Sequence, residues 1–113
     1  MNDTIVWFQK YTTLIGGPAG ATYLSDPFEV TAQNQINSEV FVVAATAAGS
    51  TAQVFGSSDM LTWTPIGAAT PLVAGPPPAA IATVNPPRYV QLQVVVPIGV
   101  TLTLWAKGVA RMT

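Results

Sequence analysis

The chain has 113 residues, and only 8% of them are Asp, Glu, Lys or Arg, against roughly 25% in an ordinary soluble domain. Its net charge is −1, and it contains neither Cys nor His, which excludes disulfides, thiolate metal sites, cysteine nucleophiles and a histidine general base. The length is close to the commonest domain size, so we expect a single domain over residues 1–113.

The charge pattern also limits the partners. The basic residues Lys10, Arg88, Lys107 and Arg111 are scattered along the sequence, which predicts no nucleic-acid partner. The most apolar stretch, from Val90 to Ala106, is interrupted by Gln, Pro, Gly and Thr and is too polar for a membrane-spanning helix. No basic segment precedes an apolar run at the N-terminus, so we expect no signal peptide, no membrane partner and assembly in the cytoplasm.

Strand signals are dense along the chain, because runs of Val, Ile and Thr alternate with Gly, Pro, Asn, Asp and Ser, whereas helical periodicity is nearly absent. In chain order the expected strands are Thr4–Leu14, Pro27–Ala32, Glu39–Thr46, Thr51–Gly56, Leu61–Ile66, Ala79–Val84, Arg88–Val96 and Val100–Val109, with a Gly-rich loop at Gly16–Gly20 after the first. This pattern predicts an all-β fold, a two-sheet antiparallel β-sandwich of the jelly-roll or immunoglobulin-like kind.

The last two expected strands alternate most clearly. Val90, Leu92, Val94 and Val96 share one face of the first, and Val100, Leu102, Leu104 and Ala106 share one face of the second. The short connection Pro97-Ile98-Gly99 predicts that the two strands pair as an antiparallel hairpin. Trp105 lies on the polar side of its strand.

Two other segments stand out. The run Val40–Ala45 is apolar on both faces, so it is either a central strand covered by a loop or a strand whose second face meets another subunit. The prolines of Gly75–Pro78 cannot donate hydrogen bonds to a sheet, which predicts a semi-rigid extended loop.

The sequence offers no catalytic apparatus. Asp26 and Glu29 are the closest pair of carboxylates, but Asp26 precedes Pro27, as expected of a turn or the start of a strand. No Ser or Thr has an activating base, and no cluster of oxygen ligands suggests a metal. We therefore expect no enzyme, no catalytic residue, no cofactor and no metal site.

The segment from Gly56 to Gly67 predicts a hairpin, in which Ser58 and Asp59 bond back to their own backbone and Trp63 enters the next strand. Together with Arg88-Tyr89-Val90-Gln91-Leu92, it resembles a hairpin and strand found in discoidin-like carbohydrate-binding sandwiches and in small β-sandwich virion proteins of tailed bacteriophages. This chain has Met60 in place of the usual glycine of the turn and Gln91 in place of a second arginine.

The resemblance implies a structural protein of a virion, such as a capsid decoration (cement) protein or a minor capsid or tail subunit. Its partners would be other virion proteins and copies of itself, with a trimer as one option. Since aromatic residues are enriched in interface centres, the candidate subunit contacts are the aromatic and proline residues outside the expected core. They are Trp7, Phe8, Tyr11, Pro76, Pro77, Pro78 and Trp105. The alternative is a carbohydrate-binding module in which an exposed ring such as Trp105 or Trp63 carries the glycan.

Overall fold

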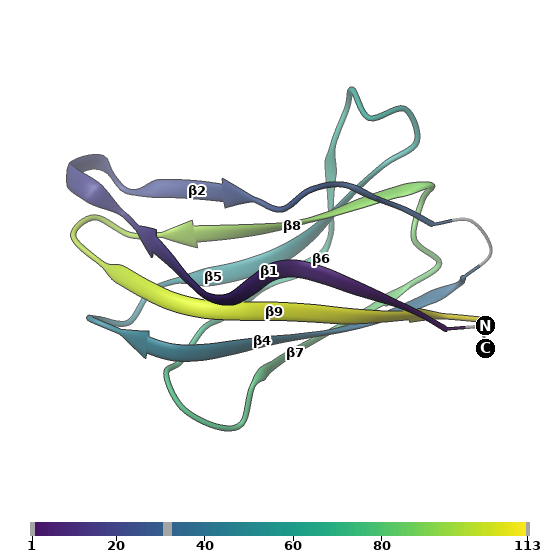
Figure 1. Ribbon diagram of the computed structural model, residues 1–113. Helices are drawn as coiled ribbons and strands as arrows, with labels where there is room; N and C mark the ends of the chain where they lie inside the picture. Colours follow the sequence, from purple (N-terminus) through teal and green to yellow (C-terminus); the bar gives the residue numbers. More distant parts are fainter. Residues whose placement is uncertain (1, 31–32, 113) are drawn as a thin grey trace.

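A computed structural model describes residues 2–30 and 33–112, and it confirms a β-sandwich of two antiparallel sheets (Figure 1). The strands are β1 (Asn2–Ile15), β2 (Ala21–Leu24), β3 (Phe28–Glu29), β4 (Gln35–Ala45), β5 (Thr51–Ser57), β6 (Thr64–Pro71), β7 (Ala79–Val84), β8 (Tyr89–Val96) and β9 (Thr101–Arg111), with a 3₁₀ turn η1 (Gly17–Ala19) between β1 and β2. One sheet has the order β1-β9-β4-β7, which we call sheet A. The other, sheet B, has the order β2-β8-β5-β6, with β3 also paired to β8.

The pairing resolves which kind of sandwich this is. The chain forms nested antiparallel pairs, with β1 against β9, β2 and β3 against β8, β4 against β7, and β5 against β6. The chain thus behaves as one long hairpin, with its tip between β5 and β6, that is rolled into two sheets. This wrapping is that of a jelly roll, the first of the two architectures expected from the sequence.

The core lies between the sheets and is supplied mainly by strands that are central in each. The side chains of Val90, Leu92, Val94 and Val96 in β8 are fully buried, as are those of Leu102, Leu104 and Ala106 in β9. The alternation predicted for both strands is therefore confirmed. Each of these Val and Leu side chains contributes about 1.5–3 kcal/mol to folding when it is removed from water.

The predicted hairpin between these two strands is wrong. β8 belongs to sheet B and β9 to sheet A, so Pro97–Gly99 crosses from one sheet to the other. Both neighbours of β9 are already defined by other strands, since it pairs with β1 on one side and β4 on the other. The two apolar faces therefore meet across the core, rather than lying side by side in one sheet.

Several strand boundaries also differ from expectation. β2 was not predicted, and β4 begins four residues earlier than the expected Glu39. Of the expected strand Pro27–Ala32, the structure forms only the two residues of β3, and residues 31 and 32 lie outside the described residues. β6 covers Thr64–Pro71 instead of Leu61–Ile66, so Trp63 precedes the strand.

The hairpin between β5 and β6 is confirmed, and side chains of its turn hold it in place. The Ser57 hydroxyl accepts hydrogen bonds from the amides of Asp59 and Met60, at 3.3 and 2.9 Å, and donates one to the Asp59 carboxylate. That carboxylate also accepts bonds from the amides of Leu61 and Thr62, at 2.8 and 3.1 Å, and these bonds lower the pKa of Asp59. Ser57, rather than the predicted Ser58, is the second side chain of the turn.

Within the described residues, no helix is long and apolar enough to cross a membrane.

Candidate interaction surface

The most distinctive surface feature is a pair of stacked aromatic rings on the outer face of sheet A. Phe41 of β4 and Trp105 of β9 are direct cross-strand partners. Their ring centroids are 4.1 Å apart and their planes differ by 7°. The buried neighbours of each residue along its strand point inward, so both rings stand on the outer face and are only half-buried. Trp105 therefore lies where the sequence placed it, on the side of β9 that faces away from the core.

Two lysine side chains cover the rings. The Lys10 ammonium group is 5.0 Å from the centroid of Trp105, and that of Lys107 is 5.7 Å from Trp105 and 5.8 Å from Phe41. β1 and β4 lie on opposite sides of β9, so Lys10 and Phe41 approach the indole from opposite sides. The two faces of the Trp105 ring are thus occupied by a second ring, which contributes about 0.5–1.5 kcal/mol, and by a cation, which contributes about 0.5–1 kcal/mol.

Lys10 reaches the indole because β1 leaves the regular sheet at this point. Phe8 pairs with Ala106 and Thr12 with Leu104, so four steps along β1 match only two along β9. The intervening residues bulge outward, and Tyr11 has a positive φ of 62°. The sharp bend of β1 is visible in Figure 1.

A second irregularity of β1 turns both Trp7 and Phe8 towards the core, although neighbouring residues of a regular strand point to opposite faces. Val6 pairs with Lys107 and Phe8 with Ala106, so Trp7 is the extra residue of a bulge. Trp7 is only 4% exposed, and its indole N–H donates a 3.1 Å hydrogen bond to the Ser38 hydroxyl. Phe8 is partly buried against the same core. Trp7 is therefore a core residue and offers no surface to a partner.

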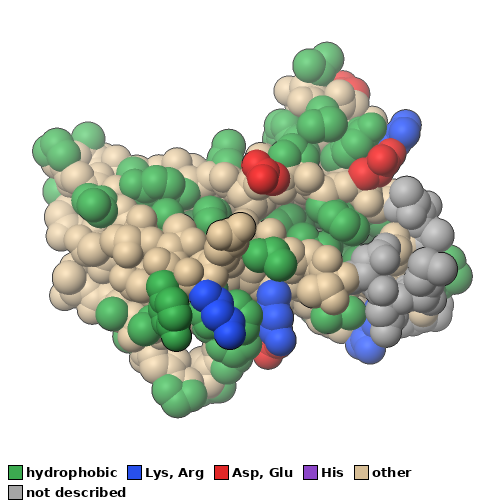
Figure 2. Space-filling view, viewed as in Figure 1, with side chains coloured by type: hydrophobic (Ala, Val, Ile, Leu, Met, Phe, Trp, Pro, Cys, Tyr) green, Lys and Arg blue, Asp and Glu red, His purple; other side chains and the backbone are tan. Residues whose placement is uncertain are grey.

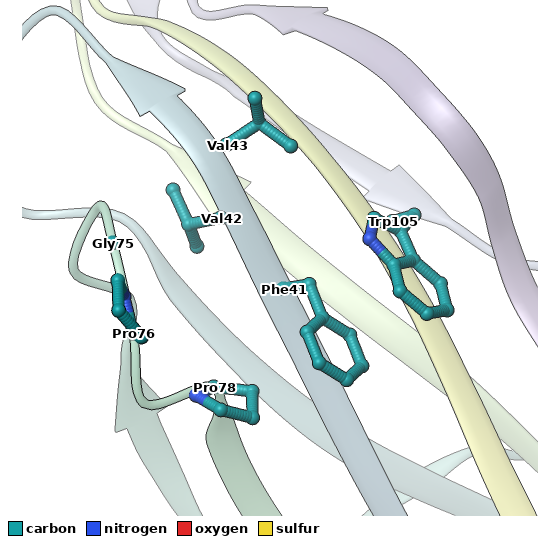
Figure 3. Close-up of a pocket in the computed structure, with 7 residues that line it drawn as sticks. All are labelled: Phe41, Val42, Val43, Gly75, Pro76, Pro78 and Trp105. Atoms are coloured by element: carbon teal, nitrogen blue, oxygen red, sulfur yellow. The ribbon is translucent and has the colours of Figure 1, made fainter.

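A hollow with a volume of about 390 Å³ opens beside the Phe41 ring. Its residues come from β4, from β9 and from the loop before β7; they are Phe41, Val42, Val43, Gly75, Pro76, Pro78 and Trp105 (Figure 3). The loop is fixed to the edge of β4 by a 3.1 Å hydrogen bond from the Gly75 amide to the Val42 carbonyl. We call this hollow the proline slot.

The proline slot brings together three of the candidate contact residues. Trp105, Pro76 and Pro78 line it, whereas Pro77 is exposed on the same loop outside the lining. Tyr11 is 70% exposed on β1 and does not line it either. This arrangement also shows the structural context of Val40–Ala45, which is a central strand whose outer face is bordered by a loop but left partly open.

The sequence did not single out Phe41, Lys10 or Lys107. For Phe41, the sequence signal was the run Val40–Ala45, which is apolar on both faces and therefore has an apolar outer face. The position of Lys10 depends on a bulge, for which the sequence carries no clear pattern.

Two of the carboxylates have structural partners. Glu29 forms an exposed ion pair with Arg88 at 2.9 Å, which raises the pKa of Arg88, and Asp59 holds the turn after β5. No group of three or more His, Cys, Asp or Glu side chains that could hold a metal occurs among residues 2–30 and 33–112. The surface around the rings therefore offers aromatic, proline, aliphatic and ammonium groups, a set suited to binding rather than to proton transfer.

No protein-family model and no curated protein sequence matches the chain. Solved structures do share its fold. The PBSX exported protein XepA aligns over 98% of this chain and 37% of its own, with a TM-score of 0.68 and 14% identity. A chain of the infectious bursal disease virus Gx strain aligns over 98% of this chain and 33% of its own, with a TM-score of 0.61 and 15% identity.

A third structure comes from Clostridium thermocellum. It is endo-1,4-β-D-xylanase 10B, with CBM22-1 and GH10 modules complexed with xylohexaose, and it aligns over 99% of this chain and 26% of its own, with a TM-score of 0.59 and 16% identity. This chain thus spans little more than a third, or less, of each of the three proteins. At such identities the likeness shows the β-sandwich fold alone.

Proposed function

We propose that the protein is a non-enzymatic structural component of a virion, such as a capsid decoration protein or a minor structural subunit, which stabilises contacts between neighbouring subunits. The observation that carries this proposal is a surface rich in exposed apolar side chains and poor in charge.

Large apolar side chains of every sheet and of several loops reach the solvent. They are Val6, Tyr11, Ile15, Leu24, Val43, Met60, Leu61, Val73, Val84, Val95, Ile98 and Met112, each between 39% and 85% exposed. Charged side chains make up only 8% of the chain, so few of them would have to be stripped of water when such a surface is covered. Figure 2 shows this on one side of the molecule, where green side chains are distributed widely and blue or red ones are few.

The fold supports the proposal without deciding it. Jelly rolls form viral capsid domains and also lectin domains. Among the solved structures with this fold, one is a virus and another is a xylanase with a CBM22-1 module.

The second candidate function is therefore carbohydrate binding, and the half-buried rings of sheet A are the specific observation in its favour. A sugar usually stacks on a free aromatic face. Because Phe41 and Lys10 cover the two sides of the Trp105 indole, that ring offers an edge and not a platform. Trp63, which is half-buried beside the β5–β6 turn, is the remaining candidate ring. The geometry thus favours a protein contact over a glycan contact.

The test is to ask where the native protein is found and what it binds. Particles produced by cells that carry this sequence are purified on a density gradient and probed for the protein with an antibody. The virion role predicts that the protein sediments with the particles at a fixed copy number and that it gives no signal on a glycan array. A protein that is absent from the particles and binds xylan or other glycans, with loss of binding in Trp63→Ala, would refute the proposal and support the module.

A further inference from the structure

The turn between β5 and β6 projects from the molecule and exposes apolar side chains. Residues 58–62, which we call the hairpin tip, are all exposed, and Leu61 and Met60 are 85% and 45% exposed. The tip projects from the body of the sandwich at the top of Figure 1, and Figure 2 shows green side chains and a red one at the same place. An apolar side chain that is this exposed on a projecting turn contributes little to the fold of its own molecule.

Side-chain hydrogen bonds also hold the hairpin tip in one conformation. The Ser57 and Asp59 side chains make five hydrogen bonds within the turn, four of them to backbone amides. A preformed loop loses little conformational freedom when it binds, which favours its use as a contact.

The proline slot is complementary to the tip in polarity and in charge. Its lining is apolar, and its volume of about 390 Å³ lies within the roughly 300–1,000 Å³ of ordinary binding pockets. Lys10 and Lys107 lie beside it, and their two positive charges outnumber the single Glu39, which is the cross-strand partner of Lys107. Asp59 is the only charged residue between Glu39 and Arg88, and its carboxylate makes the tip negative at neutral pH.

A molecule cannot fill its own slot with its own tip. The tip connects two strands of sheet B, whereas the slot is on the outer face of sheet A. In Figure 1 the tip lies at the top of the molecule, and β4 and the loop before β7 lie at the bottom.

From this complementarity we infer that the proline slot of one molecule receives the hairpin tip of a second copy, with Leu61 and Met60 against Phe41 and the prolines, and Asp59 facing Lys10 and Lys107. The two surfaces differ, so the contact is head-to-tail, and it either closes into a ring or continues as a filament. The inference builds on the proposed role in an assembly and names which surfaces join copies of the chain.

The experiment uses two variants that each damage one half of the contact. Leu61→Asp places a charge at the tip, and Val43→Asp places one in the slot, where Val43 is 50% exposed. The control is Ile98→Asp, on the β8–β9 connection, where Ile98 is 68% exposed and lines neither surface. Thermal unfolding shows whether each variant folds, and analytical ultracentrifugation measures association.

We expect the wild type and Ile98→Asp to associate with concentration, and each of the other two variants to associate at least about tenfold more weakly. The decisive sample is the mixture of Leu61→Asp with Val43→Asp. The first variant keeps an intact slot and the second an intact tip, so the mixture forms a 1:1 dimer that grows no further. Replacing Lys10 and Lys107 by Gln weakens association at low salt and reduces its dependence on salt.

Three results would overturn the inference: a wild type that is monomeric up to about 1 mM, a Leu61→Asp variant that associates as the wild type does, or a mixture that stays monomeric. None of these results contradicts the virion role, which is supported as long as the protein sediments with particles. Absence from particles would refute that role instead, whatever the state of the purified protein.

Discussion

The stacked pair on sheet A gives a prediction whose size follows from the structure. Trp105 is half-buried, with Phe41 stacked at 4.1 Å and Lys10 at 5.0 Å from its ring. Trp105→Ala removes one aromatic pair, which contributes about 0.5–1.5 kcal/mol, and two cation–π contacts, with Lys10 and Lys107, of about 0.5–1 kcal/mol each. We therefore expect a loss of about 1.5–3.5 kcal/mol in the free energy of unfolding. Trp7→Ala, the matched core variant, costs about 3–5 kcal/mol and also leaves the Ser38 hydroxyl without its donor.

The assay is urea unfolding followed by circular dichroism, because removing a tryptophan changes the fluorescence signal itself. A double-mutant cycle with Phe41→Ala isolates the stacking energy, and we expect a coupling of about 0.5–1.5 kcal/mol. If Trp105→Ala costs as much as Trp7→Ala, the ring is part of the core, and the assignment of this face to subunit contacts fails. If the coupling is zero, the two rings do not stack in solution.

Three further predictions concern turns. Met60 has a φ of 63°, so Met60→Gly relieves a strained backbone and raises stability by about 1 kcal/mol, measured by urea unfolding; a loss of stability would contradict this. Hydrogen bonds lower the pKa of Asp59 below its ordinary value of 3.8, so its contribution to stability is complete above about that pH and is lost as pH falls through the folded pKa. In an NMR titration we expect the midpoint of the Asp59 carboxyl below 3.8, and a midpoint at or above 3.8 would contradict the hydrogen bonds to this carboxylate. Asp59→Asn should make the free energy of unfolding fall less steeply below about pH 4. Gly16→Ala places a Cβ against the Pro97 carbonyl, which is part of the backbone and cannot rotate away. We therefore expect the stability, measured by thermal unfolding, to fall by about 3 kcal/mol. A loss of stability below about 1 kcal/mol would show that the loop relaxes freely.

The class of fold could be predicted because alternation is a local property. Val90 to Val96 and Leu102 to Ala106 each show which side of the strand is buried, and the structure agrees. Pairing between strands is not local in a jelly roll, where only the innermost pair, β5 with β6, is joined by a short turn. For the same reason the sequence predicted that hairpin correctly and the one around Pro97 wrongly.

The same difference between local and non-local features explains which parts of the candidate surface could be predicted. The position of Trp105 on the outer side of its strand follows from alternation alone. Its stacking on Phe41 depends on the register between two strands that lie 64 residues apart in sequence, and its contact with Lys10 depends on a bulge. The inward position of Trp7 has the same origin, since an inserted residue shifts the alternation by one.

The bulges of β1 have one more effect. β1 is an edge strand of sheet A, and a regular edge is a template on which strands of other molecules can add and aggregate. Many proteins protect such edges with charged side chains, but few are present here. The extra residues at Trp7 and before Thr12 break the row of free amides and carbonyls instead, and Pro65 and Pro71 interrupt the edge strand β6 in sheet B. A chain that exposes so much apolar surface can therefore contact its neighbours through side chains, while the interrupted edges of β1 and β6 disfavour the addition of strands from other molecules.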